Sequence, residues 1–164
     1  MKRSALLILA LSIGLLAGCQ RDQADHSQPT AQPKHEHKPP HHGTPVVLGK
    51  EEYHVELVLD PVAGRLQGYL LDGELENFVR APAASFEVVA SFKGKEEVLT
   101  FKAVANNATG ETVGDTALFE AQAEWLKTNA TFDGVLRKLT VRGTAFENIT
   151  FNFPKGNDTD ESSK

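Results

Sequence analysis

Apolar and polar residues alternate along several short stretches between residues 46 and 154. In residues 53–59 (YHVELVL) every second position, beginning at Tyr53, is apolar and alternates with His54, Glu56 and Val58, a period typical of a β-strand with one buried face. Residues 60–64 (DPVAG) predict a turn, because proline suits an early turn position and glycine accepts positive φ. Residues 65–71 are then the returning strand of a hairpin.

The same alternation predicts the rest of a β domain. Residues 117–123 fit either a strand or the start of a short helix ending near Thr128, with Trp125 and Leu126 as a core anchor, and residues 106–115 fit a polar loop. About seven strands at this spacing predict a mainly β fold, a single antiparallel β-sandwich of immunoglobulin-like architecture. The further strands are expected at residues 74–79 after a turn at 72–73, at 85–92 and 96–104 around a turn at 93–95, at 134–142 and at 145–153.

The segments outside this domain differ from it in amino-acid composition. From Gln20 to Pro45 the chain contains five prolines and five histidines but no Val, Ile, Leu or aromatic residue, so burial there does not offset the entropy of ordering. The sequence therefore predicts a signal peptide at 1–18, a disordered tether at 19–45, the β-sandwich at 46–154 and a disordered polar tail at 155–164.

The N-terminus has the pattern of an export signal. Lys2 and Arg3 precede the apolar stretch 5–16, as in a secretory signal peptide. Twelve apolar residues rising ~1.5 Å each cover ~18 Å as a helix, less than the ~30 Å of a bilayer's hydrocarbon core. We expect the segment to direct export and then to be removed.

The signal ends in Leu16-Ala17-Gly18-Cys19, which resembles the lipobox of bacterial lipoproteins and holds the only cysteine. The resemblance implies that Cys19 carries a diacylglycerol thioether and becomes the acylated N-terminus. It places the protein on a bacterial membrane facing the periplasm, and Gln20, in place of an aspartate, favours the outer membrane. The alternative is cleavage elsewhere, leaving Cys19 as a free or dimer-forming thiol.

Charge and motifs narrow the classes of function. Residues 1–18 hold two basic and no acidic residues, so the remaining chain has 15 basic against 22 acidic residues, a net charge of −7. Its basic residues are dispersed apart from Arg137-Lys138, which argues against nucleic acid as a partner. Neither a Gly-x-Ser-x-Gly elbow nor a phosphate-binding glycine loop occurs, so we expect no enzymatic activity.

Histidine placement is the strongest chemical signal, because five of the six histidines fall in the tether. Imidazole ligates Cu²⁺, Zn²⁺ and Ni²⁺, so a divalent metal ion is the expected cofactor. The alternatives are a polar linker that merely tolerates histidine and, for the strand residue, a partly buried histidine paired with a carboxylate. The candidate ligands are His35, His37, His41, His42 and, at the start of the first strand, His54.

Residues 41–49 (HHGTPVVLG), running into 52–60 (EYHVELVLD), are similar to the opening that precedes the adaptor subunits of some heavy-metal efflux pumps and that occurs in small periplasmic lipoproteins. The family pattern has two glycines after the histidine, where this chain has Gly43-Thr44. The resemblance implies that His41, His42 and His54 serve a protein of metal efflux or homeostasis, with an efflux or other envelope protein as partner. The alternative is a non-catalytic envelope module that holds a partner through an exposed strand edge or loop.

Overall fold

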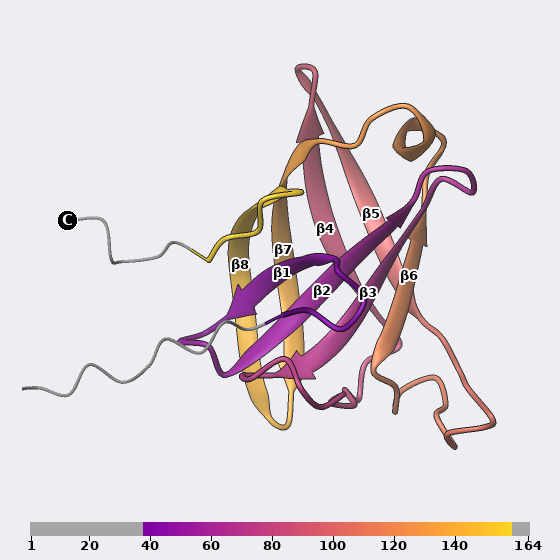
Figure 1. Cartoon of the computed structure of the whole chain (residues 1–164), viewed down its shortest axis with the longest axis vertical. Helices are drawn as coiled ribbons and strands as arrows, with labels where there is room; N and C mark the ends of the chain where they lie inside the picture. Colours follow the sequence, from indigo (N-terminus) through magenta and orange to yellow (C-terminus); the bar gives the residue numbers. More distant parts are fainter. Residues whose placement is uncertain (1–37, 159–164) are drawn as a thin grey trace, which may run out of the picture. The chain divides into compact units, whose positions relative to one another are not determined.

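The computed structural model describes residues 38–158, in which every long element is a β-strand (Figure 1). One turn of 3-10 helix, η1 (Glu124–Lys127), follows the sixth strand. The predicted mainly β, antiparallel fold is confirmed. The strands are β1 (Thr44–Leu48), β2 (Tyr53–Asp60), β3 (Arg65–Asp72), β4 (Ser85–Phe92), β5 (Lys95–Ala103), β6 (Leu118–Gln122), β7 (Phe132–Val141) and β8 (Thr144–Phe153).

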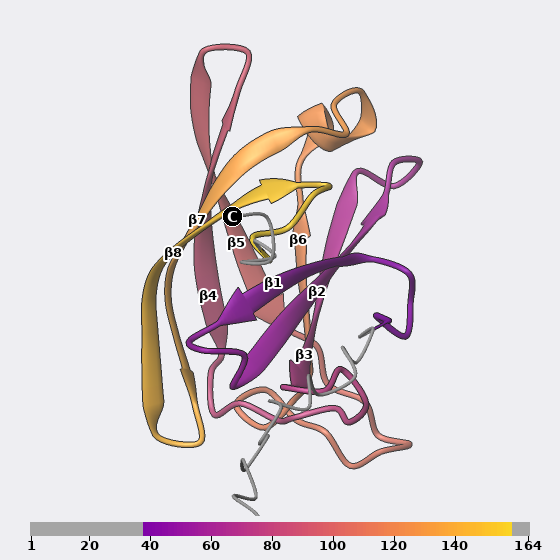
Figure 2. The same cartoon turned by 60° about the vertical axis from the view of Figure 1, so that its left-hand side comes forward.

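The eight strands form one antiparallel sheet in the order β1-β2-β3-β6-β5-β4-β7-β8. A sandwich implies two hydrogen-bonded sheets, whereas here a single sheet curls until β1–β3 face β4, β7 and β8 across the core (Figures 1 and 2). The sheet is nearly closed, because the edge strands β1 and β8 approach each other: the Thr44 hydroxyl donates to the Pro154 carbonyl (3.0 Å). Face-to-face packing is thus achieved within one sheet.

The core lies inside this curl and draws on both halves of the sheet. Leu57 on β2 and Leu70 on β3 are almost fully buried, as are Leu136 on β7 and Phe151 on β8. Gly134 on β7 is required for this packing, because a Cβ at that position would lie 2.3 Å from the Phe151 ring. Close packing of this kind leaves no space for an added methyl group.

The hairpin of β7 and β8 changes face partway along its length. On β7 the buried positions are 132, 134 and 136 and then 139 and 141, so the alternation skips one residue at Arg137. On β8 the same shift falls next to Asn148, which has a φ of 56°. The left-handed residue allows both strands to turn their apolar side chains toward the core as the sheet bends.

Most local predictions are confirmed. The hairpins β2–β3 and β4–β5, the loop at 106–115 and the strands β7 and β8 lie where the alternation placed them. Residues 117–127 contain both alternatives, since β6 is followed directly by η1, and Leu126 is buried.

The strand predicted at residues 74–79 is wrong. The Asp72 carboxylate accepts hydrogen bonds from the backbone N–H groups of Glu76 (3.0 Å) and Asn77 (3.2 Å), and Leu75 has a φ of 58°. A side chain that bonds nearby backbone groups competes with sheet formation. The segment is therefore a turn, and its only strand-like pairing with β3 is a single bridge between Phe78 and Leu71.

The folded part also exceeds the predicted boundaries at 46 and 154. β1 begins at Thr44, and the polar residues before it are held on the sheet through Glu56. At the other end, the Asn157 carboxamide accepts from the Val47 N–H (2.7 Å) and donates to the Val47 carbonyl (3.2 Å). Hydrogen bonds from polar residues, which hydropathy does not register, extend the domain at both ends.

Several predictions fall outside the described residues. They concern the signal peptide, the lipidation of Cys19, the ligands His35 and His37, and residues 159–164. In the described part of the chain, no helix has the length and apolar character needed to cross a bilayer.

Candidate functional site

The most unusual polar group in the described structure is the Glu56 carboxylate on β2, which is 0% exposed. Val55 and Leu57 on either side of it point into the core, so Glu56 and His54 point to the opposite face of the strand. At Glu56 that face is also covered, because residues 41–43 lie against it before β1 begins. Both faces of β2 are therefore buried around Glu56.

Three hydrogen bonds compensate the burial of this carboxylate. Its Oε1 accepts from the backbone N–H groups of His41 and Gly43, both at 2.8 Å. Its Oε2 lies 2.8 Å from Nδ1 of His41, which donates because the carboxylate only accepts. A buried carboxylate needs such partners, and all three come from the last residues of the histidine-rich segment.

The His41 ring is fixed further by aromatic neighbours. It stacks on Tyr69 of β3, with ring centroids 3.9 Å apart and planes at 17° to each other. The centroid of the Phe78 ring lies 5.8 Å from that of His41, with the two planes tilted. Burial raises the pKa of Tyr69 above its ordinary value, with further contributions from the charges of Glu120 and Glu56. The His41 side chain remains 35% exposed, so a held imidazole is still accessible from solvent.

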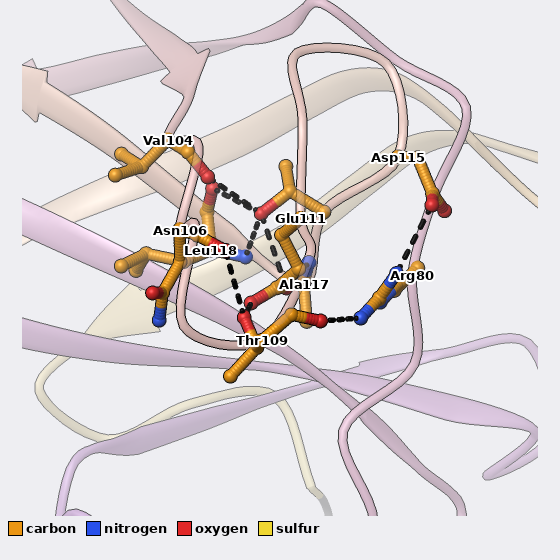
Figure 3. A network of polar contacts seen from close by, with 9 residues as sticks. Arg80, Val104, Asn106, Thr109, Glu111, Asp115, Ala117 and Leu118 are labelled. Atoms are coloured by element: carbon orange, nitrogen blue, oxygen red, sulfur yellow. Dashed lines mark hydrogen bonds and ion pairs between the residues drawn. The ribbon is translucent and has the colours of Figure 1, made fainter.

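A pocket of about 400 Å³ adjoins this aromatic group, and Tyr69 and Phe78 form part of its wall. On its far side, the Arg80 guanidinium donates to the Thr109 carbonyl (2.6 Å) and to Asp115 (3.1 Å), linking the loop after β3 to the loop before β6 (Figure 3). Leu118 contributes to the apolar part of the wall.

Glu111 organises the second of these loops. Its Oε1 accepts from the Ala117 backbone N–H (2.8 Å) and the Thr116 hydroxyl (3.2 Å), and its Oε2 accepts from Thr109 (Figure 3). Burial alone would raise the pKa of Glu111, but these hydrogen bonds and the charge of Arg80 hold it below its ordinary value. The ionised carboxylate thus stabilises this wall of the pocket.

Of the five predicted metal ligands, the described structure contains three. His41 is held by Glu56, and His42 follows it in an exposed turn with a φ of 56°. His54 is 4% exposed, and its Nδ1 donates to the Asp72 carbonyl (3.1 Å). Within residues 38–158, no three His, Cys, Asp or Glu side chains are grouped so that they could hold a metal ion.

Glu56, Tyr69 and Phe78 were not singled out from the sequence. Glu56 follows the alternation of an ordinary strand, in which a glutamate on the polar face is expected to be solvated. The segment that covers it is itself polar, so no local apolar signal indicates burial. Only the abrupt change from a histidine-rich tether to a strand at this point hints at a special junction.

The chain matches no protein-family model, no curated protein and no solved structure. The geometry around His41 and Glu56 is therefore the basis for the function proposed below.

Proposed function

We propose that the protein is a membrane-tethered periplasmic lipoprotein that binds a divalent transition-metal ion through the histidines before β1. The observation that carries the metal part is the buried Glu56 carboxylate, which holds His41 by its Nδ1. The lipobox-like sequence ending at Cys19 supports the tether.

The carboxylate–histidine pair has the form that metal-ligating histidines usually take. Such a histidine donates one ring N–H to a carboxylate or carbonyl, which fixes its tautomer and orientation and increases the basicity of the other nitrogen. Here the bond to Glu56 occupies Nδ1 and leaves Nε2 as the nitrogen that would ligate. His41 thus supplies one oriented ligand at the surface of a stable sheet.

The remaining ligands would come from the same short stretch of chain. His42 is adjacent in sequence, and His35 and His37 precede it by a few residues. A set of imidazoles without thiols suits Cu²⁺, Ni²⁺ and Zn²⁺ rather than Cu⁺, with Cu²⁺ bound most tightly of the three. In this assignment His54 is a buried residue of β2 and not a ligand.

Calorimetric titration of the mature chain, beginning at Cys19, with each of the three ions tests the metal part. We expect micromolar or tighter binding that weakens as the solution becomes acidic, because protonated imidazole does not ligate. His41→Gln should weaken binding, and replacing His35, His37, His41 and His42 together should abolish it.

His26→Gln is the matched control, because His26 lies in the same tether but outside the proposed ligand set. It should leave the affinity unchanged. Equally weak binding by all variants would contradict the metal role. Mass spectrometry of protein from its native host tests the tether separately, since an unmodified Cys19 thiol would exclude lipidation.

A further inference from the structure

β5 lies in the middle of the strand order but is paired on one side for only a fraction of its length. It runs from Lys95 to Ala103, yet its register with β6 covers only Lys102 and Ala103. On its other side the pairing with β4 continues to the hairpin turn. From Lys102 back toward Lys95, β5 and β6 diverge (Figures 1 and 2). Most of β5 therefore has an open edge on the side of β6.

The hydrogen bonds at the C-terminal end of β5 show which backbone groups this edge presents. The Ala103 N–H donates to the Ala84 carbonyl, toward β4, whereas the Val104 N–H donates to the Leu118 carbonyl, toward β6, both at 2.9 Å. Backbone groups of successive residues in a strand point to opposite sides. The N–H and C=O groups of Glu96, Val98 and Thr100 therefore point toward β6, and no residue among 38–158 pairs with them.

The edge of β1 shows how this chain satisfies an open edge elsewhere. Both backbone groups of Val47 are bonded by the Asn157 carboxamide, which takes the place of a neighbouring strand. No comparable side chain within the described residues serves Val98 or Thr100. An unprotected edge is a template for strand addition.

A groove of about 520 Å³ runs along the open part of β5, with Val98, Thr100 and Lys102 on one side and β3 and β6 on the other. Val98 is 48% exposed. The lining contains two basic residues, Arg65 and Lys102, and one acidic residue, Glu120, so it carries a net charge of +1 in a chain of net charge −5. The Arg65 guanidinium is already paired with Asp60 (3.1 Å), and its buried Nε lies 4.0 Å from Glu120. Lys102 is the cation of the lining for which the described residues provide no ion-pair partner.

We propose that the open edge of β5 binds one extended segment of a partner protein, antiparallel to β5, with an apolar residue against Val98 and an acidic residue toward Lys102. A single strand is favoured because β5 and β6 bound the groove on both sides. A second copy of this chain would have to insert its β5 together with the attached β4. Backbone hydrogen bonds would supply most of the affinity and the side chains the selectivity.

A short synthetic peptide of alternating valine and glutamate, acetylated and amidated at its ends, is the probe. We expect the amide NMR signals of Glu96, Val98 and Thr100 to shift on titration and to give a dissociation constant. Val98→Pro should weaken binding about tenfold, because it removes one edge donor without removing a β4–β5 hydrogen bond. Val98→Thr keeps the donor and should retain most of the affinity, and a peptide with lysine in place of glutamate should bind less tightly.

Two results would overturn the proposal. One is a failure of the binding test: either neither peptide shifts the amide signals of Glu96, Val98 and Thr100, or Val98→Pro and the unmodified protein bind the peptide with equal affinity. The other is sedimentation showing a dimer that Val98→Pro dissociates, because a second copy would then occupy the edge. Neither result bears on metal binding at His41, so this proposal and the proposed function fail separately.

Discussion

Replacing Glu56 by glutamine tests the junction between the histidine-rich segment and the sheet. The substitution preserves the side chain's shape, and its oxygen still accepts from the His41 and Gly43 N–H groups, which now share an Oε1. The amide nitrogen, however, takes the place of the oxygen that faces Nδ1 of His41. Because an amide nitrogen only donates, neutral His41 must accept through Nδ1 and carry its proton on Nε2.

The expected effects follow from these three bonds. Hydrogen bonds to charged groups contribute about 1.5–3 kcal/mol and neutral ones about 0.5–1.5 kcal/mol, while an amide costs less to bury than a carboxylate, so we expect the free energy of unfolding to fall by about 1–3 kcal/mol. Protonation of Nε2 removes the nitrogen proposed to ligate. Loss of such a supporting carboxylate typically costs about 10–100-fold in metal affinity.

Urea unfolding followed by the fluorescence of Trp125, the only tryptophan, measures the first effect, and zinc titration measures the second. Glu87→Gln is the matched control: Glu87 pairs with Arg137 at the surface (2.6 Å), and exposed pairs contribute about 0–1 kcal/mol. If Glu56→Gln and Glu87→Gln unfold at the same urea concentration and bind zinc equally, the reasoning about Glu56 is refuted.

Three further predictions concern other parts of the domain. The pKa of Tyr69 is raised above 10.0 by burial and by the charges of Glu120 and Glu56. The folded state therefore favours the neutral phenol, and the free energy of unfolding should fall as the pH rises above about 10. In urea unfolding at high pH, Tyr69→Phe should reduce that fall, and an unchanged pH dependence would contradict the prediction. The pH dependence has the opposite sign for Glu111, whose hydrogen bonds keep its pKa below the ordinary value despite its burial. Its contribution to the free energy of unfolding is present above about pH 4.5 and is lost as the pH falls through the lowered pKa. Glu111→Gln should therefore make the free energy of unfolding less dependent on pH in that range. Gly134→Ala should lower the free energy of unfolding by about 1–3 kcal/mol through overpacking against Phe151, and Phe151→Leu in the same chain should recover part of the loss; additive losses in the double variant would show that the two residues do not compete for space.

The sequence predicts hairpins well where alternation and turn residues agree. β2 and β3 flank a turn with proline and glycine, and β4 and β5 flank Lys93-Gly94, so local chemistry determines both pairs. The pairing of β3 with β6 joins residues more than 45 positions apart. No local pattern specifies that partner, and for this reason one curled sheet was not distinguished from two stacked sheets.

The candidate site was predicted only in part, for a related reason. His41 was identified because histidine is rare and its cluster stands out by composition. Glu56 lies on the polar face of the predicted strand, and its burial cannot be predicted because the segment that covers it is polar and contributes no hydrophobic signal. Likewise, the Asp72 side chain bonds the backbone after β3 and overrides an alternation that otherwise favours a strand.

The attachment of residues 41–43 to Glu56 also has a mechanical consequence. Tension applied to the chain from its N-terminal side reaches the hydrogen bonds of His41 and Gly43 before it reaches the first rung of β1 at Thr44. The hydrogen bonds to the carboxylate therefore resist the pull first, and those between β1 and β2 bear load only after the bonds to Glu56 have broken. A metal ion bound at His41 would sit at the point where such a pull enters the fold.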